Sequence, residues 1–255
     1  MKKRYFAIAC SAVMFLSVFS GDLPYINAAS VNGALSVPYS FKNIDGDDKP
    51  KAFEKTNLIN IALGTGRSKK KISMSELKAS ATIYVPVKTV SKNGSSFGVM
   101  FSAVTDPKKY GDKENASSLD GAYIAAISKQ NGKLKKGLYD AMDGAELEGA
   151  ANHITIKRGK GSHKNDYIMT INNIPYNYLD GQPVSNSRHY LRAVVLSVYG
   201  QDQKAAGNIC IDKVSVKRAK KTVLNYTFDS KKGMPKDVSA ICNNKSVKGI
   251  DIVGL

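Results

Sequence analysis

The sequence of 255 residues contains no tryptophan, only three histidines and only three cysteines. The lack of tryptophan argues against binding to crystalline or long neutral glycans, because flat aromatic faces provide the stacking surface for sugar rings. No glycine-rich phosphate-binding loop follows a strand into a helix. The histidines, His153, His163 and His189, lack a cysteine or serine partner motif for nucleophilic catalysis. The sequence therefore carries no catalytic signature and does not identify a substrate.

The N-terminus holds the longest apolar run. Residues 2–4 are basic, and the apolar run 5–19 has the length of a signal-peptide core, too short for an ordinary membrane span. Cys10 lies in the middle of this run, so we assign it to the signal and not to a lipoprotein anchor. Small residues near position 28 fit cleavage, so we expect residues 1–28 to be a signal peptide. The mature chain is then extracellular or at the cell surface, without a membrane span; the alternative is an uncleaved N-terminal anchor.

The charge of the chain is strongly positive. The formal net charge is +17, and residues 1–28 hold three basic side chains and one acidic one, so +15 remains for the mature chain. This balance favours anionic partners such as wall polymers, acidic polysaccharides, nucleic acids or anionic membrane surfaces. The alternative is a solubilising surface, because the basic residues are scattered over several expected turns. These turns are Arg67–Lys71, Lys133–Lys136, Lys157–Lys164 and Lys217–Lys221.

Two cysteines, Cys210 and Cys242, remain after the signal segment. In an exported protein such a pair is a candidate disulfide, which would connect the C-terminal tail to the strand that contains Cys210. Two buried free thiols are the alternative. A zinc site would need more ligands than this pair supplies.

Short segments with strand patterns, separated by turns, fill most of the chain. Between residue 78 and Pro86 the odd positions are apolar and the even ones carry Ser80, Thr82 and Tyr84, which predicts a half-buried strand. Residues 97–104 are apolar on both sides, as in a central strand. A hairpin turn is predicted at Asn131-Gly132, while the following residues 134–147 fit a short helix and a strand equally well. About ten strands without alternating helices predict an all-β fold, an antiparallel two-sheet β-sandwich of the jelly-roll kind.

The segment Asn152–Arg218 contains four apolar runs, 153–157, 166–174, 188–199 and 208–217, and forms the second half of this sandwich. In the last run the apolar residues change parity between Ile211 and Val214. A β-bulge near Asp212-Lys213 would restore the register.

We expect residues 29–218 to form one sandwich domain and residues 219–255 to form a tail. The run 222–229 echoes 37–42 near the start, so the tail is either an edge strand docked on the sandwich or a curtailed second copy of the module. With only about 35 residues, the tail is too short to build a core of its own. We expect a monomer.

Five segments, in this order, resemble strands of a known group of β-sandwiches: Leu77–Val85, Ser96–Phe101, Asn152–Ile156, Asp166–Asn172 and Gly207–Val216. Over residues 34–218 the chain resembles the concanavalin A-like sandwiches of the laminin-G and glucanase type, and the jelly-roll carbohydrate-binding modules found beside bacterial glycoside hydrolases. The last segment resembles the closing edge strand of such modules. The resemblance implies a two-sheet sandwich that binds a glycan.

The resemblance also implies a structural Ca²⁺ ion. In the resembled modules an acid at the position of Asp212 often binds calcium together with oxygen atoms near the N-terminal strand, where Asp45 and Asp47 are the candidates. Calcium takes about six to eight oxygen ligands, so backbone carbonyls near Phe41 would also contribute. Such modules often end with Asp-Asp or Asp-Asn, whereas in this chain the second residue is Lys213. The alternative is that Asp212 caps a bulge or pairs with a lysine.

Thirteen tyrosines supply most of the aromatic faces of the chain. The long loop 175–187 combines stacking and hydrogen-bonding groups that suit a sugar: Tyr176, Tyr178, Asp180 and Gln182. Tyr84, on the polar side of its strand, is a further candidate. The alternative for each tyrosine is a half-buried core position with a solvated hydroxyl.

Enzymes of this fold class would need paired acids or a base. Glu146 and Glu148 would share one side of a strand, but the E-x-D-x-x-E pattern of laminarinase-like enzymes is absent, so we interpret both as surface charges. A polysaccharide lyase would use a tyrosine, histidine or basic residue, and Tyr190 with His189 and Arg188 or Arg192 is the nearest match. Neighbouring strand residues face opposite sides, so at most alternate members of this set share a face.

The signal segment, the strand pattern and the resemblance favour an exported, non-catalytic glycan-binding or cell-surface module. The positive charge favours an anionic polysaccharide or cell-wall polymer as its ligand. One alternative is a small sandwich polysaccharide lyase or glycoside hydrolase, and another is a structural or adhesive sandwich that binds a protein. No specific nucleic acid is expected, because aromatic and basic residues do not interleave.

Overall fold

The structure is a computed structural model that describes residues 32–41, 58–64, 68–73, 76–104, 123–140, 150–175, 188–191, 193–201, 205–242 and 245–255. Most of these residues lie in β-strands, and no α-helix occurs within these ranges. In particular, no helix in them has the length and hydropathy needed to cross a membrane. The predicted all-β fold is confirmed.

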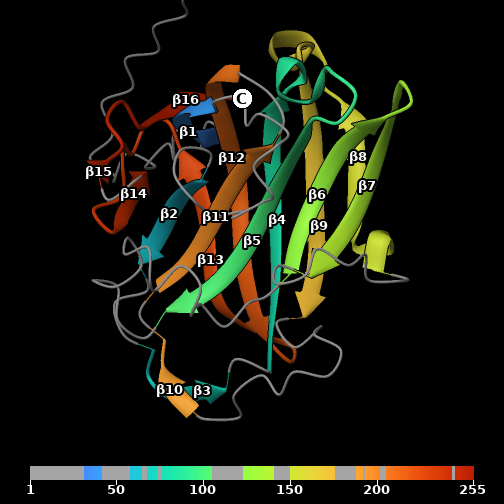
Figure 1. The fold of residues 1–255 in the computed structure, drawn as a ribbon. Coiled ribbons are helices and arrows are strands. Elements are labelled where there is room, and N and C mark those ends of the chain that lie inside the picture. The colour runs from blue at the N-terminus through green and yellow to red at the C-terminus, as the bar shows by residue number, and fades with distance from the viewer. Residues whose placement is uncertain are drawn as a thin grey trace, which may run out of the picture. The chain divides into compact units, whose positions relative to one another are not determined.

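Two seven-stranded antiparallel sheets carry the described part of the chain (Figure 1). Sheet A contains β1 (Asn32–Phe41), β4 (Leu77–Pro86), β8 (Ile154–Arg158), β9 (Asp166–Pro175), β12 (Ala205–Arg218), β13 (Lys221–Asp229) and β16 (Asp251–Gly254). Sheet B contains β2 (Leu58–Gly64), β5 (Ser96–Val104), β6 (Tyr123–Gln130), β7 (Lys133–Asp140), β11 (Ala193–Gln201), β14 (Val238–Cys242) and β15 (Lys245–Ser246). A separate pair joins β3 (Lys71–Ser73) to β10 (Arg188–Tyr190), and short 3-10 turns lie at η2 (Val87–Val90), η4 (Ala150–His153) and η5 (Gly161–His163).

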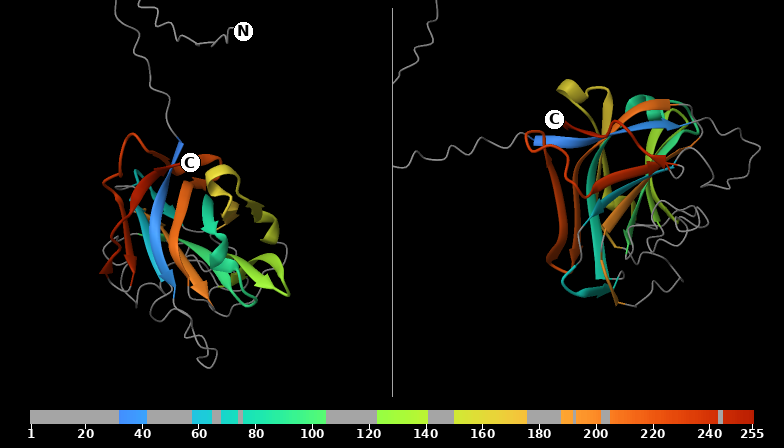
Figure 2. Two further views of the ribbon diagram at one scale, coloured as in Figure 1. Left: turned by 90° about the horizontal axis from the view of Figure 1, so that it is seen from above. Right: turned by 90° about the vertical axis from the view of Figure 1, so that its left-hand side faces the viewer.

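The two sheets form two layers that bury one hydrophobic core between them (Figure 2). Sheet A contributes residues such as Leu35 and Ile83, and sheet B contributes Phe97, Phe101 and Leu196, all fully buried. This arrangement is the predicted two-sheet sandwich. The more specific concanavalin A-like type remains a prediction.

The alternation predicted for β4 is observed. Its odd-numbered residues from Leu77 to Val85 are buried, while its even-numbered residues are partly or fully exposed. Tyr84 therefore lies on the outer face of sheet A. The strand ends at Pro86, as predicted, because proline has no N–H to continue the ladder.

The predicted bulge in β12 is also confirmed. Against β4, Ile211 pairs with Ile83 and Lys213 pairs with Thr82, so Asp212 is the extra residue. The bulge returns the following apolar residues to the inner face, and Ile211 and Val214 are both fully buried. The resemblance implied that β12 is an edge strand. This prediction is wrong, because β4 lies on one side of β12 and β1 and β13 lie on the other.

The tail contributes to both sheets. After the turn at residues 219–220, β13 pairs with β12, β14 pairs with β2 in sheet B, and β16 pairs with β1 in sheet A. Residues Val31–Leu255 form one compact unit, and the other unit, Met1–Ser30, lies outside the described residues. Of residues 134–147, which fitted a helix and a strand equally well, 134–140 lie in β7 and 141–147 lie outside the described residues.

Candidate functional site

Three loops meet at one end of the sandwich. The loop after β4, the β6–β7 hairpin and the β8–β9 turn lie together because hydrogen bonds join them. Gly132 N–H donates to Asn93 Oδ1 over 2.9 Å, and Val87 N–H donates to the Asn165 carbonyl over 2.8 Å. A further bond runs from Gly94 N–H to the carbonyl of Lys129. We name the three segments 86–96, 128–136 and 156–166 the basic end.

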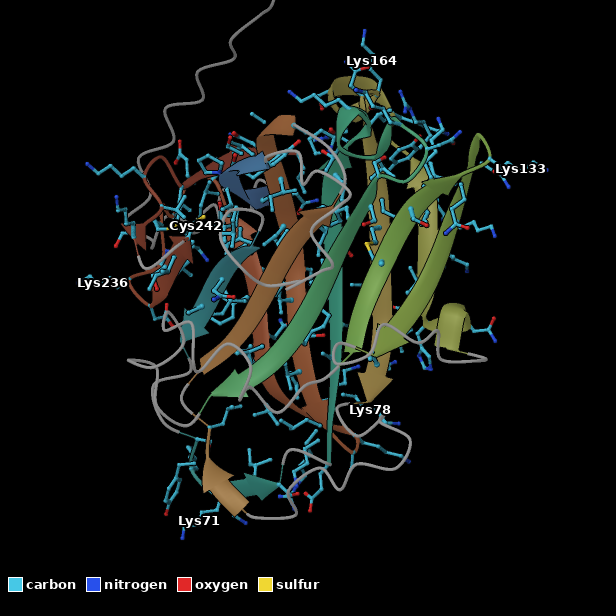
Figure 3. All side chains as sticks on the ribbon, in the orientation of Figure 1. Lys71, Lys78, Lys133, Lys164, Lys236 and Cys242 are labelled. Atoms are coloured by element: carbon cyan, nitrogen blue, oxygen red, sulfur yellow. The ribbon has the colours of Figure 1, made fainter. Side chains whose placement is uncertain are left out.

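The basic end carries almost only positive charge. Its ten cationic side chains are Lys88, Lys92, Lys129, Lys133, Lys135, Lys136, Lys157, Arg158, Lys160 and Lys164, and its single carboxylate is that of Asp166. All of these cations except Lys129 are classed as exposed. Within the described part of the chain none of them forms an ion pair, and the Asp166 carboxylate is bonded to His163 instead. Figure 3 shows Lys133 and Lys164 at this end and Lys71 and Lys78 at the opposite one.

Two other connecting segments contain a larger share of acidic residues. Segment 42–57, between β1 and β2 in the sequence, holds equal numbers of acidic and basic residues and lies outside the described residues. At the opposite end, Arg218 forms an ion pair with Glu76. Segment 141–149, which follows β7 in the sequence and lies outside the described residues, contains three acids and no basic residue. Among the described residues, the basic end thus combines ten cations with one carboxylate.

A polar cluster on the outer face of sheet A adjoins the basic end. Tyr84 pairs with Ile168 of β9 and with Cys210 of β12, two residues before β4 ends. The half-buried Tyr84 ring lies 4.5 Å, centroid to centroid, from the ring of His163, with 47° between their planes. His163 Nδ1–H donates to Asp166 Oδ2 over 2.8 Å, which holds the imidazole against Tyr84. Since His163 Nε2 has no partner among the described residues, the tautomer protonated on Nδ1 fits this site.

In this cluster, burial favours the protonated forms of Asp212, Tyr84 and Cys210. Burial raises the pKa of Asp212, and Lys213 partly opposes the rise. Burial also raises the pKa of Tyr84, and the Asp212 carboxyl adds to that rise. Burial likewise raises the pKa of the Cys210 thiol, while a hydrogen bond with Ser36 lowers it. The phenol and the thiol are therefore protonated at neutral pH, which suits hydrogen bonding better than nucleophilic or base catalysis.

The structure brings Tyr84 and Asp212 together, although the sequence suggested them for two different sites. The other glycan-binding candidates, Tyr176, Tyr178, Asp180 and Gln182, lie outside the described residues. Their loop starts at Pro175, which pairs with Lys78, whereas Tyr84 pairs with Ile168. The loop therefore leaves β9 about 20 Å from Tyr84, at the opposite end of the strand.

The calcium candidates Asp45 and Asp47 also lie outside the described residues. Phe41, where the chain leaves sheet A before them, pairs with Ala205, seven residues from Asp212 in β12. Phe41 is thus about 20 Å from Asp212 along the strand. Among the described residues, no group of three or more histidine, cysteine or acidic side chains could hold a metal ion. The calcium site stays a prediction.

The two cysteines lie in different sheets, Cys210 in β12 and Cys242 in β14, and both thiols are free. Each is half-buried, and burial raises the pKa of Cys242 as well. Figure 3 labels Cys242.

The residues considered for catalysis are not part of this site. Glu146 and Glu148 lie outside the described residues. Arg188, His189 and Tyr190 form β10, which pairs with β3 away from the two main sheets, and Lys71 lies over the Tyr190 ring at 6.0 Å from its centroid.

Sequence reasoning missed the pairing of His163 with Asp166 and the gathering of the lysines. An i, i+3 spacing of histidine and aspartate directly after a glycine-containing turn was the available signal for the first. The second needed the strand order, because the three loops are far apart in the sequence. Comparisons with protein-family models, with curated proteins and with solved structures each found no match.

Proposed function

We propose that this chain is an exported, non-catalytic module that binds an anionic polysaccharide or cell-wall polymer through its basic end. The observation that carries the proposal is the set of ten cations facing one carboxylate, without ion pairs in the described part of the chain. Unpaired exposed lysines create a positive field that attracts a polyanion. The signal-like N-terminus places such a module where wall polymers and secreted polysaccharides occur.

The arrangement of the loops supports binding to a long ligand. The cations come from three loops that are held together by backbone and asparagine hydrogen bonds. A polymer with many negative charges can contact several of them at once, whereas a small anion contacts one or two. Tyr84 and Asp212 adjoin these cations, and burial raises the pKa of the Tyr84 phenol, so the phenol is protonated and suits hydrogen bonding better than base catalysis.

The test compares two variants that each lose four exposed lysines. The basic-end variant carries Gln at Lys88, Lys92, Lys160 and Lys164, and the control carries Gln at Lys69, Lys70, Lys220 and Lys221 at the opposite end. Each lysine near an anionic surface contributes about 1 kcal/mol, so we expect the basic-end variant to bind polygalacturonate at least about tenfold more weakly. The control should bind within about threefold of the unmodified protein.

Neutral dextran and soluble starch complete the panel and should not retain the protein. Equal loss in both variants would mean that net charge alone drives retention and would contradict a binding end. Release of shorter products from polygalacturonate during incubation would instead establish the lyase or hydrolase alternative.

A further inference from the structure

A regular row of side chains crosses the outer face of sheet A. The strand registers place Thr155 of β8 opposite Thr170 of β9, and Thr170 opposite Thr82 of β4. The same registers continue from Thr82 to Lys213 of β12 and then to Thr227 of β13. We name these five residues the threonine row.

The threonine row is accessible and has free hydrogen-bonding groups. Thr155, Lys213 and Thr227 are exposed, and Thr82 and Thr170 are partly exposed. Within the described part of the chain none of the four hydroxyls forms a hydrogen bond. Adjacent strands lie about 4.8 Å apart, so the row offers one polar side chain per strand over about 19 Å. The distance between adjacent strands is close to the length of one sugar ring in a polysaccharide.

The neighbouring row toward the basic end contains the aromatic cluster. Lys157 of β8 pairs with Ile168, which pairs with Tyr84. Lys157 and Tyr84 are each two residues along their strands from a member of the threonine row, Thr155 and Thr82. The ring of His163 packs on Tyr84 and is fixed by its bond to Asp166. Asp212, the bulged residue, lies between Cys210 and Lys213 in β12.

We propose that the threonine row and Tyr84 form a subsite for the sugar rings of an anionic polysaccharide whose charged groups contact the basic end. This inference rests on the proposed function and specifies its ligand as a carboxylated polymer of pyranose rings. Threonine hydroxyls both donate and accept hydrogen bonds, as sugar hydroxyls do. Lys157 and Lys213 lie where they meet the carboxylates of such a chain, and Tyr84 provides an apolar ring face with a polar tip.

Other polyanions match the face less well. A polyphosphate has no rings for Tyr84 and no hydroxyls for the threonines, so it would use the basic end alone. A single-stranded nucleic acid stacks its bases on several successive aromatic side chains. Tyr84 and His163 are the aromatic side chains of this cluster, and the threonine row has none.

The experiment measures affinity for three probes: a galacturonate oligosaccharide, inorganic polyphosphate and a single-stranded DNA oligonucleotide. The subsite variants are Tyr84→Ala and the double variant Thr82→Val with Thr170→Val, which keeps β-branched side chains on the sheet. Thr222→Val is the matched control, since it is exposed on β13 and lies about 15 Å along that strand from Thr227. Thermal unfolding of each variant checks that the fold is retained.

We expect both subsite variants to bind the galacturonate oligosaccharide about tenfold more weakly and polyphosphate without change. The four-lysine basic-end variant should lose affinity for both probes, and Thr222→Val for neither.

If the subsite variants bind galacturonate normally while the basic-end variant does not, the subsite is wrong and the proposed function stands. If no polyanion binds the unmodified protein, the proposed function itself fails. Tighter binding of DNA than of galacturonate, dependent on Tyr84, would overturn the sugar assignment.

Discussion

At the scale of single residues, the ionised side chain of Asp212 lowers the stability of the folded chain. It is the extra residue of the β12 bulge, so it interrupts pairing with β4 while its apolar neighbours stay in the core. Burial raises the pKa of its carboxyl, which means that the ionised form is less favourable in the folded chain than in the unfolded one. Its side chain acts electrostatically on Tyr84, within the cluster beside the basic end. A residue that weakens the fold is typical of a functional position.

The first prediction concerns the substitution Asp212→Asn. Because the folded pKa lies above the unfolded one, the stabilising effect of protonation is present at low pH and is lost as pH rises through the folded pKa. The ionised carboxylate therefore destabilises the fold at neutral pH, and Asn removes this effect. We expect the melting temperature to rise by roughly 2 °C or more at pH 7, and to be unchanged at about pH 3. Asp251→Asn, at an exposed position, is the control and should have no such pH-dependent effect.

The second prediction concerns the thiols of Cys210 and Cys242, which are free and half-buried. Burial raises both pKa values, so the native protein should react slowly with iodoacetamide at neutral pH. After denaturation without reductant, mass spectrometry should find both cysteines alkylated. A peptide pair linked through these two residues would show instead that the protein forms a disulfide.

Single-residue inference from the sequence succeeded where strand periodicity governs orientation. The period of two placed Tyr84 outside and Ile83 inside, and the change of parity located the bulge at Asp212. It did not find His163 beside Tyr84, because that contact depends on how the β8–β9 turn folds over a neighbouring strand.

At the scale of elements, the β6–β7 hairpin positions part of the basic end. Asn131 and Gly132 have φ of 49° and 74°, the left-handed values of a tight type I′ turn. The turn projects Lys133 and its neighbours beside the loop after β4, to which Gly132 N–H is bonded. The local sequence predicted this turn because few residue pairs other than Asn-Gly adopt it readily.

The third prediction tests that turn with Gly132→Ala. A Cβ atom at Gly132 would meet no atom within 4 Å, so the whole effect comes from the positive φ. We expect the free energy of unfolding to fall by about 1–2 kcal/mol. Gly254→Ala, where a Cβ also has open space but φ is not in the left-handed region, is the matched control and should be close to neutral. Equal effects of the two substitutions in chemical denaturation would contradict the turn assignment.

The fourth prediction concerns the tail, residues 219–255. It supplies β13 and β16 to sheet A and β14 to sheet B, together with the buried side chains Leu224 and Phe228. Burial of two such side chains contributes about 3–6 kcal/mol, which is comparable with the whole stability of many domains. We expect a chain ending at Arg218 to lose cooperative thermal unfolding by circular dichroism. A truncated chain with an unchanged melting temperature would mean that the tail is separable.

Element boundaries were predictable where proline or an Asn-Gly turn marks them, as at Pro86 and Asn131-Gly132. Pro38 fits the prediction for an edge position locally, since β16 pairs with β1 only from Gly33 to Ser36. The helix-or-strand ambiguity after residue 133 could not be resolved from local pattern, because β7 is defined by pairing along its length with β6.

At the scale of the whole molecule, the layered sandwich followed from the number and pattern of the strands, but the strand order did not. β1 pairs with β12 and β4 pairs with both β9 and β12, across separations that no local pattern encodes. These long-range pairings bring Lys88, Lys133 and Lys160 to one end, and they make β12 a central strand. Lysines that are far apart in the sequence thus gather at one end of the fold.

The most direct test of the account is the salt dependence of binding to polygalacturonate. Exposed charges are screened over about 10 Å at 0.1 M salt, so affinity should fall steadily as salt rises. The slope of log Kd against log salt should be clearly shallower for the basic-end variant (Lys88, Lys92, Lys160 and Lys164 to Gln) than for the unmodified protein. The variant lacking Lys69, Lys70, Lys220 and Lys221 should keep the original slope. Identical slopes for all three proteins, or affinity that does not respond to salt, would contradict the claim that the basic end binds an anionic polymer.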